Sequence, residues 1–277
     1  MSATLTIDRD RIRRWADFSG DYNPIHFERQ AARALGAADV IVHGMIGAVL
    51  AFQRLWDDDR ANGQVIGVRT LTAKLRHPIV VDEALRLVVK RGRQGASCSL
   101  IGADDIIRVG ATLRPAGEHE PVAVHPDLPC YKIDRYDLAS RDVNARRGNL
   151  RHALPECTSF WLGLASCFFS EFLGRAIEPL RLQAQRLLGV QTVADAVAVQ
   201  TSYAVTVDPT VEDLASDGGI VDYACTFAPG VMVPVEGGCM GDVTWTVSSG
   251  PRCVLVTSVG LLLKQNPSTS GAVHGKR

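Results

Sequence analysis

Three side chains suited to acid–base chemistry lie close together near the start of the chain. Asp21, Asn23 and His26 fall within the stretch Ser19-Gly20-Asp21-Tyr22-Asn23-Pro24-Ile25-His26. Gly20 and Pro24 favour a bend, so the carboxylate and the imidazole can face one water molecule instead of spreading along a strand. A water held by both groups is suited to addition to a substrate or to elimination from it. The stretch therefore predicts an acid–base site.

A second motif, Ile41-Val42-His43-Gly44-Met45, leads into a helix of small and apolar residues that begins near His43. Backbone N–H groups at the start of a helix favour a negative charge, and a glycine lets a substrate approach closely. Each motif alone also has a purely structural explanation. The first is typical of an Asx turn with a surface histidine, and His43 could serve only to cap the helix or to bond a neighbouring loop.

At this spacing, the two motifs resemble the signature of the MaoC-like (R)-specific enoyl thioester hydratases and dehydratases. That signature reads S-G-D-x-N-P-[LI]-H, then an Ala-rich helix, then I-x-H-G-[ML]. The resemblance implies reversible hydration of trans-2-enoyl thioesters, or dehydration of (R)-3-hydroxyacyl thioesters, in fatty acid or polyketide metabolism. The acyl group would be carried by coenzyme A or by an acyl carrier protein, and no cofactor would be required.

The resemblance also assigns roles to residues of this chain. Asp21 and His26 would be catalytic and would hold the reacting water. Asn23 would orient Asp21 or the water, and the backbone N–H of Gly44 would meet the negative charge on the thioester oxygen. His43 would support the site.

Two other functions remain open. A hot-dog thioesterase also uses a carboxylate and a bound water, and a non-catalytic acyl-thioester binding subunit would share the fold. The N-P-x-H and H-G-M elements favour the hydratase, and the presence of both Asp21 and His26 argues against a binding subunit.

The first half of the chain has the pattern of a sheet wrapped around one helix. Residues from Gly44 to about Trp56 are apolar on nearly every face, so this helix should be buried. Around it the sequence predicts a strand or short helix, a helix and three strands, at Leu5–Trp15, Glu28–Leu35, Ile66–Leu75, Ala84–Gly92 and Ser97–Leu113. A buried helix followed by an antiparallel sheet predicts a hot-dog fold of the α+β class.

The second half repeats this order of elements after a proline-rich linker at Pro115–Pro129. It predicts a strand, an apolar helix and four further strands, at Tyr131–Leu138, Ser159–Leu173, Ala196–Val207, Gly219–Phe227, Met240–Val247 and Cys253–Leu263. The chain is therefore expected to be a double hot-dog, monomeric or homodimeric. Its catalytic domain would span residues 1–118, and residues 119–277 would form a diverged domain without the catalytic motif.

Composition excludes several classes of function. The 30 basic and 30 acidic residues give no general positive field for nucleic acid or an anionic membrane. The N-terminus has no apolar signal segment, which predicts a cytoplasmic protein. The seven cysteines contain no C-x-x-C pair and are expected to be buried free thiols. No set of residues has metal-ligand spacing, so no metal is expected.

Two further side chains each leave two interpretations open. His77, next to Pro78, is expected to shape a strand end, with contact to the thioester's pantetheine arm as the alternative. Glu171 interrupts an apolar helix and should either emerge at its end or point into a cavity.

Overall fold

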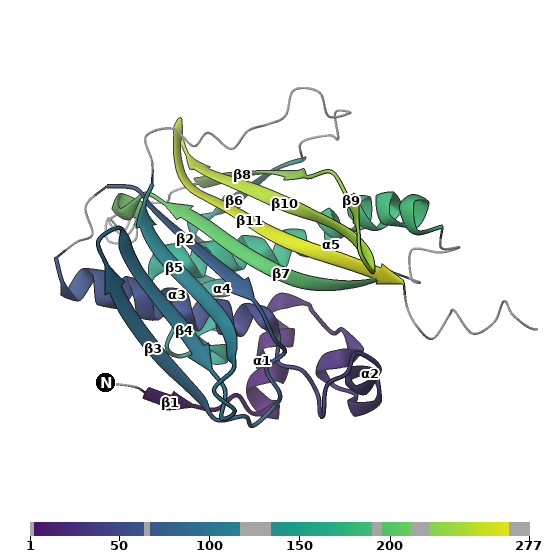
Figure 1. Ribbon diagram of the computed structural model, residues 1–277. Helices are drawn as coiled ribbons and strands as arrows, with labels where there is room; N and C mark the ends of the chain where they lie inside the picture. The colour runs from purple at the N-terminus through teal and green to yellow at the C-terminus, as the bar shows by residue number, and fades with distance from the viewer. Residues whose placement is uncertain (1–2, 64–66, 117–133, 190–195, 212–221, 266–277) are drawn as a thin grey trace, which may run out of the picture.

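One antiparallel sheet extends through both halves of the molecule (Figure 1). The computed structural model describes residues 3–63, 67–116, 134–189, 196–211 and 222–265. Within them, the strand order is β1-β3-β4-β5-β2-β7-β11-β10-β8-β6, with β9 attached to β10. Helices α3, α4 and α5 lie behind the sheet in the view of Figure 1, and α1 and α2 lie at its lower end.

The first half contributes the sheet from β1 to β2 and four helical segments. Its elements are β1 (Ala3–Leu5), α1 (Arg9–Ser19), the 3-10 helix η1 (Pro24–His26), α2 (Arg29–Ala34), α3 (Gly44–Ala61), β2 (Arg69–Leu75), β3 (Leu85–Gly92), β4 (Gly95–Ile101) and β5 (Ile107–Pro115). Helix α3 is buried along most of its length, as its apolar sequence predicts. Gly47 lets it lie close to the sheet, because a Cβ there would be 2.9 Å from a methyl carbon of Val109.

The second half contributes the sheet from β7 to β6. Its elements are β6 (Asp134–Ala139), α4 (Ser140–Ala153), α5 (Phe160–Leu188), β7 (Ala196–Val207), β8 (Asp222–Pro229), β9 (Val233–Val235), β10 (Gly238–Ser249) and β11 (Arg252–Gln265). The order β7-β11-β10-β8-β6 mirrors β2-β5-β4-β3-β1 of the first half. The predicted repeat is therefore present, and the chain is a double hot-dog of the α+β class.

The two halves meet where β2 pairs with β7, with Arg69 opposite Val207 and Lys74 opposite Ser202. This pairing leaves neither central strand with a free edge, which is the physical reason for joining two such sheets. The core continues across the junction, since the Trp56 and Trp161 rings pack edge to face with centroids 5.0 Å apart.

Several predicted boundaries were wrong. The single strand predicted at Ser97–Leu113 is two strands, β4 and β5, joined by a turn in which Asp105 has a φ of 62°. The stretch Leu5–Trp15 contains the end of β1 and most of α1. The second-half helix predicted to end at Leu173 continues to Leu188.

Two elements of the second half, α4 and β9, were not predicted at all. The linker prediction also began too early, because Pro115 ends β5. The rest of the linker is mostly in residues 117–133, outside the described residues, so the division at 118/119 stays a prediction.

Four of the cysteines are buried as predicted, namely Cys98, Cys157, Cys225 and Cys239. Cys253 is exposed instead, and Cys130 and Cys167 lie where side chains are not described. Burial raises the pKa of the Cys98 thiol to about 12, so it packs as an apolar group. Within the described parts of the chain, no helix combines the length and apolar character needed to cross a membrane.

Candidate active site

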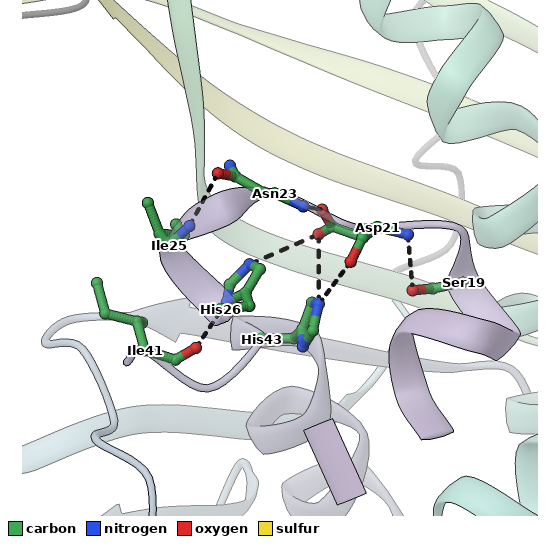
Figure 2. Close-up of polar contacts among 7 residues, drawn as sticks. All are labelled: Ser19, Asp21, Asn23, Ile25, His26, Ile41 and His43. Atoms are coloured by element: carbon green, nitrogen blue, oxygen red, sulfur yellow. Dashed lines mark hydrogen bonds and ion pairs between the residues drawn. The ribbon is translucent and has the colours of Figure 1, made fainter. Parts of the chain in front are cut away.

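Local hydrogen bonds set the position of Asp21 directly after α1. The helix ends at Gly20, whose φ of 73° is a left-handed conformation that glycine adopts without strain. The Ser19 hydroxyl then accepts a hydrogen bond from the backbone N–H of Asp21, at 3.2 Å. Asp21 Oδ1 in turn accepts one from the N–H of Asn23, also at 3.2 Å (Figure 2). The second carboxylate oxygen, Oδ2, is left for other partners.

Asn23 begins the 3-10 helix that carries His26. Its Oδ1 accepts a hydrogen bond from the N–H of Ile25 at 3.3 Å, so the side chain caps η1. Pro24 follows at the first helical position, where its fixed φ is favourable. Among the described residues, no hydrogen bond joins the Asn23 side chain to the Asp21 carboxylate. Asn23 therefore shapes the loop through its backbone and its cap.

His26 is held by one ring nitrogen and faces Asp21 with the other (Figure 2). Its Nδ1 lies 2.6 Å from the carbonyl oxygen of Ile41, which can only accept a hydrogen bond. In the neutral ring the proton is therefore on Nδ1, and Nε2 has a free lone pair. Nε2 lies 3.8 Å from Asp21 Oδ2, too far for a direct hydrogen bond and suited to a shared water.

His43 lies against His26 as a second, fully buried imidazole. The two rings stack with centroids 3.7 Å apart. His43 Nε2 is 2.9 Å from the backbone oxygen of Asp21, to which it donates, and 4.0 Å from Oδ2. His43 makes no side-chain cap for α3, and its buried Nδ1 has no partner among the described residues. It thus links the start of α3 to the loop of Asp21 and His26.

The surroundings keep both imidazoles neutral near pH 7. Burial lowers the pKa of His26, and the Asp21 carboxylate and the Ile41 carbonyl partly oppose that shift. Burial and the adjacent His26 lower the pKa of His43 to about 4. Neutral His26 can therefore accept a proton, and an imidazolium formed at His26 would be stabilised by the Asp21 carboxylate.

Gly44 places the first N–H of α3 at the edge of the same site. No hydrogen bond to this N–H is found among the described residues, as expected for the first helical position. A Cβ at Gly44 would lie 2.5 Å from a Leu75 methyl carbon. Only a glycine at this position therefore leaves space between the start of α3 and Leu75.

A cavity of about 810 Å³ lies between the two halves. Asp21, Asn23, His26 and Gly44 form part of one wall, whereas His43 lies behind it. His77 also lines the cavity, at its exposed rim after β2. The side chain of Glu171 falls outside the described residues.

The opposite wall comes from the second half and was not predicted. Arg181 of α5, Gln200 and Thr201 of β7, and Lys264 of β11 line the cavity. No motif marks these residues in the sequence, because they reach the site only through the pairing of β2 with β7. The half without the motif therefore forms part of the candidate site.

Asp21, His26 and His43 also present ligand-type atoms within 4.8 Å of one another. The sequence shows no metal-ligand spacing here, because His43 is far from the other two along the chain. A cation could use all three only if His43 Nε2 left the Asp21 carbonyl oxygen. The present hydrogen bonds suit a shared water better than a metal ion.

Comparison with known proteins finds one family match, in the first half. Residues 1–101 match the MaoC-like domain family. No curated protein matches the chain in sequence. A conserved hypothetical protein of Mycobacterium tuberculosis, described as having a double hot-dog fold, matches over 94% of both chains with 13% identity and a TM-score of 0.51. This likeness supports the fold.

Two other solved structures are less similar. A protein named MaoC-like dehydratase has 12% identity and a TM-score of 0.47, over 94% of this chain and 97% of its own. The (R)-hydratase of A. caviae involved in PHA biosynthesis has 17% identity and a TM-score of 0.33, over 42% of this chain and 93% of its own. At these TM-scores neither name bears on the reaction of this chain.

Proposed function

We propose, because residues 1–101 match the MaoC-like domain family, that the protein reversibly hydrates trans-2-enoyl thioesters and dehydrates (R)-3-hydroxyacyl thioesters. The observation that carries the proposal is the separation of 3.8 Å between Asp21 Oδ2 and His26 Nε2 in the cavity wall. Both atoms are acceptors when His26 is neutral. A water between them would donate one hydrogen to each and direct a lone pair at the substrate.

In the hydration direction, this water attacks C3 of the enoyl group. Its oxygen bonds to C3, one O–H bond breaks, and His26 Nε2 takes the proton. The π electrons move toward the thioester carbonyl and form an enolate. His26 then returns the proton to C2, so the imidazole is neutral again at the end. A positioned acid–base group of this kind contributes about 10²–10⁴ in rate.

The enolate oxygen would be met by the N–H of Gly44 at the start of α3. That N–H has no other partner among the described residues, and the helix dipole favours negative charge there. An N–H aimed at the developing charge stabilises the transition state more than the ground state.

We propose that His43 is a positioning residue. Its hydrogen bond to the Asp21 carbonyl holds the backbone of Asp21, and its ring stacks on His26, so it would fix the positions of both residues from outside the cavity. The acyl group would be carried by coenzyme A or an acyl carrier protein, in the cytoplasm, and the reaction would need no metal or redox cofactor.

The test is the loss of conjugated enoyl absorbance when the full-length protein is mixed with a trans-2-enoyl coenzyme A thioester. Asp21→Asn and His26→Gln should each lower kcat by about 10²–10⁴, because each loses one holder of the water. Asp17→Asn is the matched control, since Asp17 bonds only the exposed Tyr22 hydroxyl among the described residues and should leave kcat unchanged. Turnover should persist in a chelator.

The same reaction separates hydration from thioester hydrolysis. Hydration removes the enoyl absorbance without releasing a free thiol, whereas hydrolysis releases one. Release of thiol by the unmodified protein, lost in Asp21→Asn, would replace the hydratase proposal with a thioesterase. Full activity of Asp21→Asn would contradict the role given to that carboxylate in either reaction.

A further inference from the structure

Arg181 is a cation in the cavity wall with an unused donor. It belongs to α5 and lines the cavity from the second half. Its side chain is partly buried, and its Nε is fully buried with no hydrogen-bond partner among the described residues. Buried donors are nearly always paired in folded proteins, so this unpaired Nε marks a guanidinium without an observed partner at the cavity wall.

Two polar side chains lie beside a β-bulge on the same wall. In the pairing of β7 with β11, Ser202 is opposite Gly260 and Gln200 is opposite Leu261, so Thr201 is an extra residue. Four consecutive residues of β7, 198–201, line the cavity, and Gln200 and Thr201 are the polar pair among them.

Gly260 makes room for this bulge. A Cβ at Gly260 would lie 2.3 Å from the Ser202 hydroxyl oxygen and 3.0 Å from that of Thr201. The side chains of Gln200 and Thr201 have no hydrogen-bond partner among the described residues, so both remain available to a ligand.

The side chains that line the cavity carry more positive than negative charge. Arg76, Arg181 and Lys264 line it, whereas Asp21 is its one lining carboxylate among the described residues. Arg76 and Lys264 are exposed at the rim, but Arg181 is partly buried. No ion pair of Arg181 is found in the described part of the chain. The charge therefore favours an anionic ligand, and the burial of Arg181 places part of that charge within the cavity.

We propose that Arg181, with Gln200 and Thr201, binds a carboxylate on the acyl chain of the substrate. The preferred substrate would then be the thioester of a dicarboxylic acid, with one carboxyl group in the thioester and the other on Arg181. A guanidinium pairs with the two oxygens of a carboxylate, and the amide and hydroxyl can complete its hydrogen bonding. This inference rests on the proposed function, because that function places the thioester at Asp21 and His26.

The test compares two substrates that differ only in the distal carboxylate. They are trans-2-hexenedioyl coenzyme A and trans-2-hexenoyl coenzyme A, which share the same phosphates. The unmodified protein should have the higher kcat/KM with the dicarboxylic substrate. Arg181→Met should lower that kcat/KM by about 10- to 100-fold, the range for one lost charge-assisted interaction, and change the other less than about threefold.

Two variants control for folding and for general charge. Arg181→Lys keeps the positive charge and should restore part of the preference. Arg186→Met removes an exposed cation from the same helix and should change neither kcat/KM. Equal losses on both substrates in Arg181→Met would overturn the proposal, since they would indicate phosphate binding or a structural role. Equal kcat/KM values in the unmodified protein would also overturn it.

Binding without turnover separates this inference from the proposed function. Calorimetry with the saturated hexanedioyl and hexanoyl coenzyme A thioesters needs no hydration. Tighter binding of the dicarboxylic thioester, lost in Arg181→Met, would support the anion site even if no enoyl thioester were hydrated. Hydration of hexenoyl coenzyme A with no such binding difference would support the proposed function and overturn the anion site.

Discussion

Helices α3 and α5 hold equivalent places in the two halves, but their N-termini serve different purposes. In chain order, each follows the outermost strand of its half and precedes the strand at the central junction. At α3, Gly44 lines the cavity, and its N–H has no partner among the described residues. At α5, Gln53 Oε1 accepts hydrogen bonds from the N–H groups of Thr158 and Ser159, both at 3.1 Å.

The difference shows how one architecture can supply either a binding site or a joint. A helix start whose first N–H has no partner suits a ligand with negative charge, whereas the two residues just before α5 are tied to α3 through Gln53. Gln53 is itself part of α3, so the helix that begins at the candidate site also anchors the other half.

The largest effect should come from removing the second half. A chain that ends at residue 116 exposes the edge of β2 that pairs with β7, and it leaves Phe52 and Trp56 without Tyr203 and Trp161. We expect this chain to aggregate or to pair with a second copy, because an open central strand invites edge pairing. Sedimentation of the purified chain measures this.

Addition of residues 117–277 as a separate chain should restore a soluble complex. A stable and active monomer of the shortened chain would show that the first half does not need its counterpart.

The joint itself can be broken by Gln53→Leu. The substitution leaves the N–H of the buried Ser159 unpaired, at a cost of about 1–3 kcal/mol, whereas the N–H of the exposed Thr158 can bond water instead. Chemical denaturation should therefore show a lower free energy of unfolding by about 1–3 kcal/mol.

Thr158→Val is the matched control for this joint. It removes only the hydroxyl contact with Gln53 Nε2, so its loss should be smaller, about 1 kcal/mol. A loss for Gln53→Leu no larger than that of the control would mean that the position of α5 does not depend on the hydrogen bonds from Thr158 and Ser159 to Gln53.

His43 at the start of α3 should make stability depend on pH. Its pKa is about 4 in the folded protein and 6.5 in an unperturbed ring, so below pH 6.5 the unfolded state binds a proton that the folded state does not. As the pH is lowered from 6.5 to 4, the free energy of unfolding should therefore decrease, by an amount on the order of 2 kcal/mol. The group contributes no such slope above pH 7.

His43→Gln should flatten this slope, because glutamine does not titrate and can still donate to the Asp21 carbonyl. His152→Gln, at an exposed position on α4, is the control and should leave the slope unchanged. Denaturation curves at several pH values give the comparison, and an equal slope with and without His43 would contradict the prediction.

The smallest effect concerns the space at the open helix terminus. Gly44→Ala would press on the Leu75 methyl group and narrow the approach to the N–H, so kcat/KM should fall about tenfold with little change in thermal stability. The double variant Gly44→Ala/Leu75→Ala should recover most of the loss. If the double variant recovers no activity, the alanine methyl group at position 44 lowers kcat/KM by shifting the backbone and not by its contact with Leu75.

Within each half, the sequence predicted much of the local structure. The bounds of β7 match the predicted strand Ala196–Val207, and α3 begins at Gly44 as expected. The loop of Asp21 and His26 could be recognised because its bend depends on neighbours such as Gly20 and Pro24. The turn between β4 and β5 was missed. Its residues, Gly102-Ala103-Asp104-Asp105, are few, and the apolar residues on either side were interpreted as one continuous strand.

The sequence by itself determined the fold class and the position of the acid–base loop, because hydrophobic periodicity, caps and turns act over a few residues. Only the tertiary structure decided which residues complete the cavity. Arg181 and Thr201 reach it through a pairing between β2 and β7, strands separated by more than 100 positions. The bulge at Thr201 depends on Gly260 of yet another strand. Contacts of that range leave no pattern in a single sequence, because their energy exists only once the two sheets have joined.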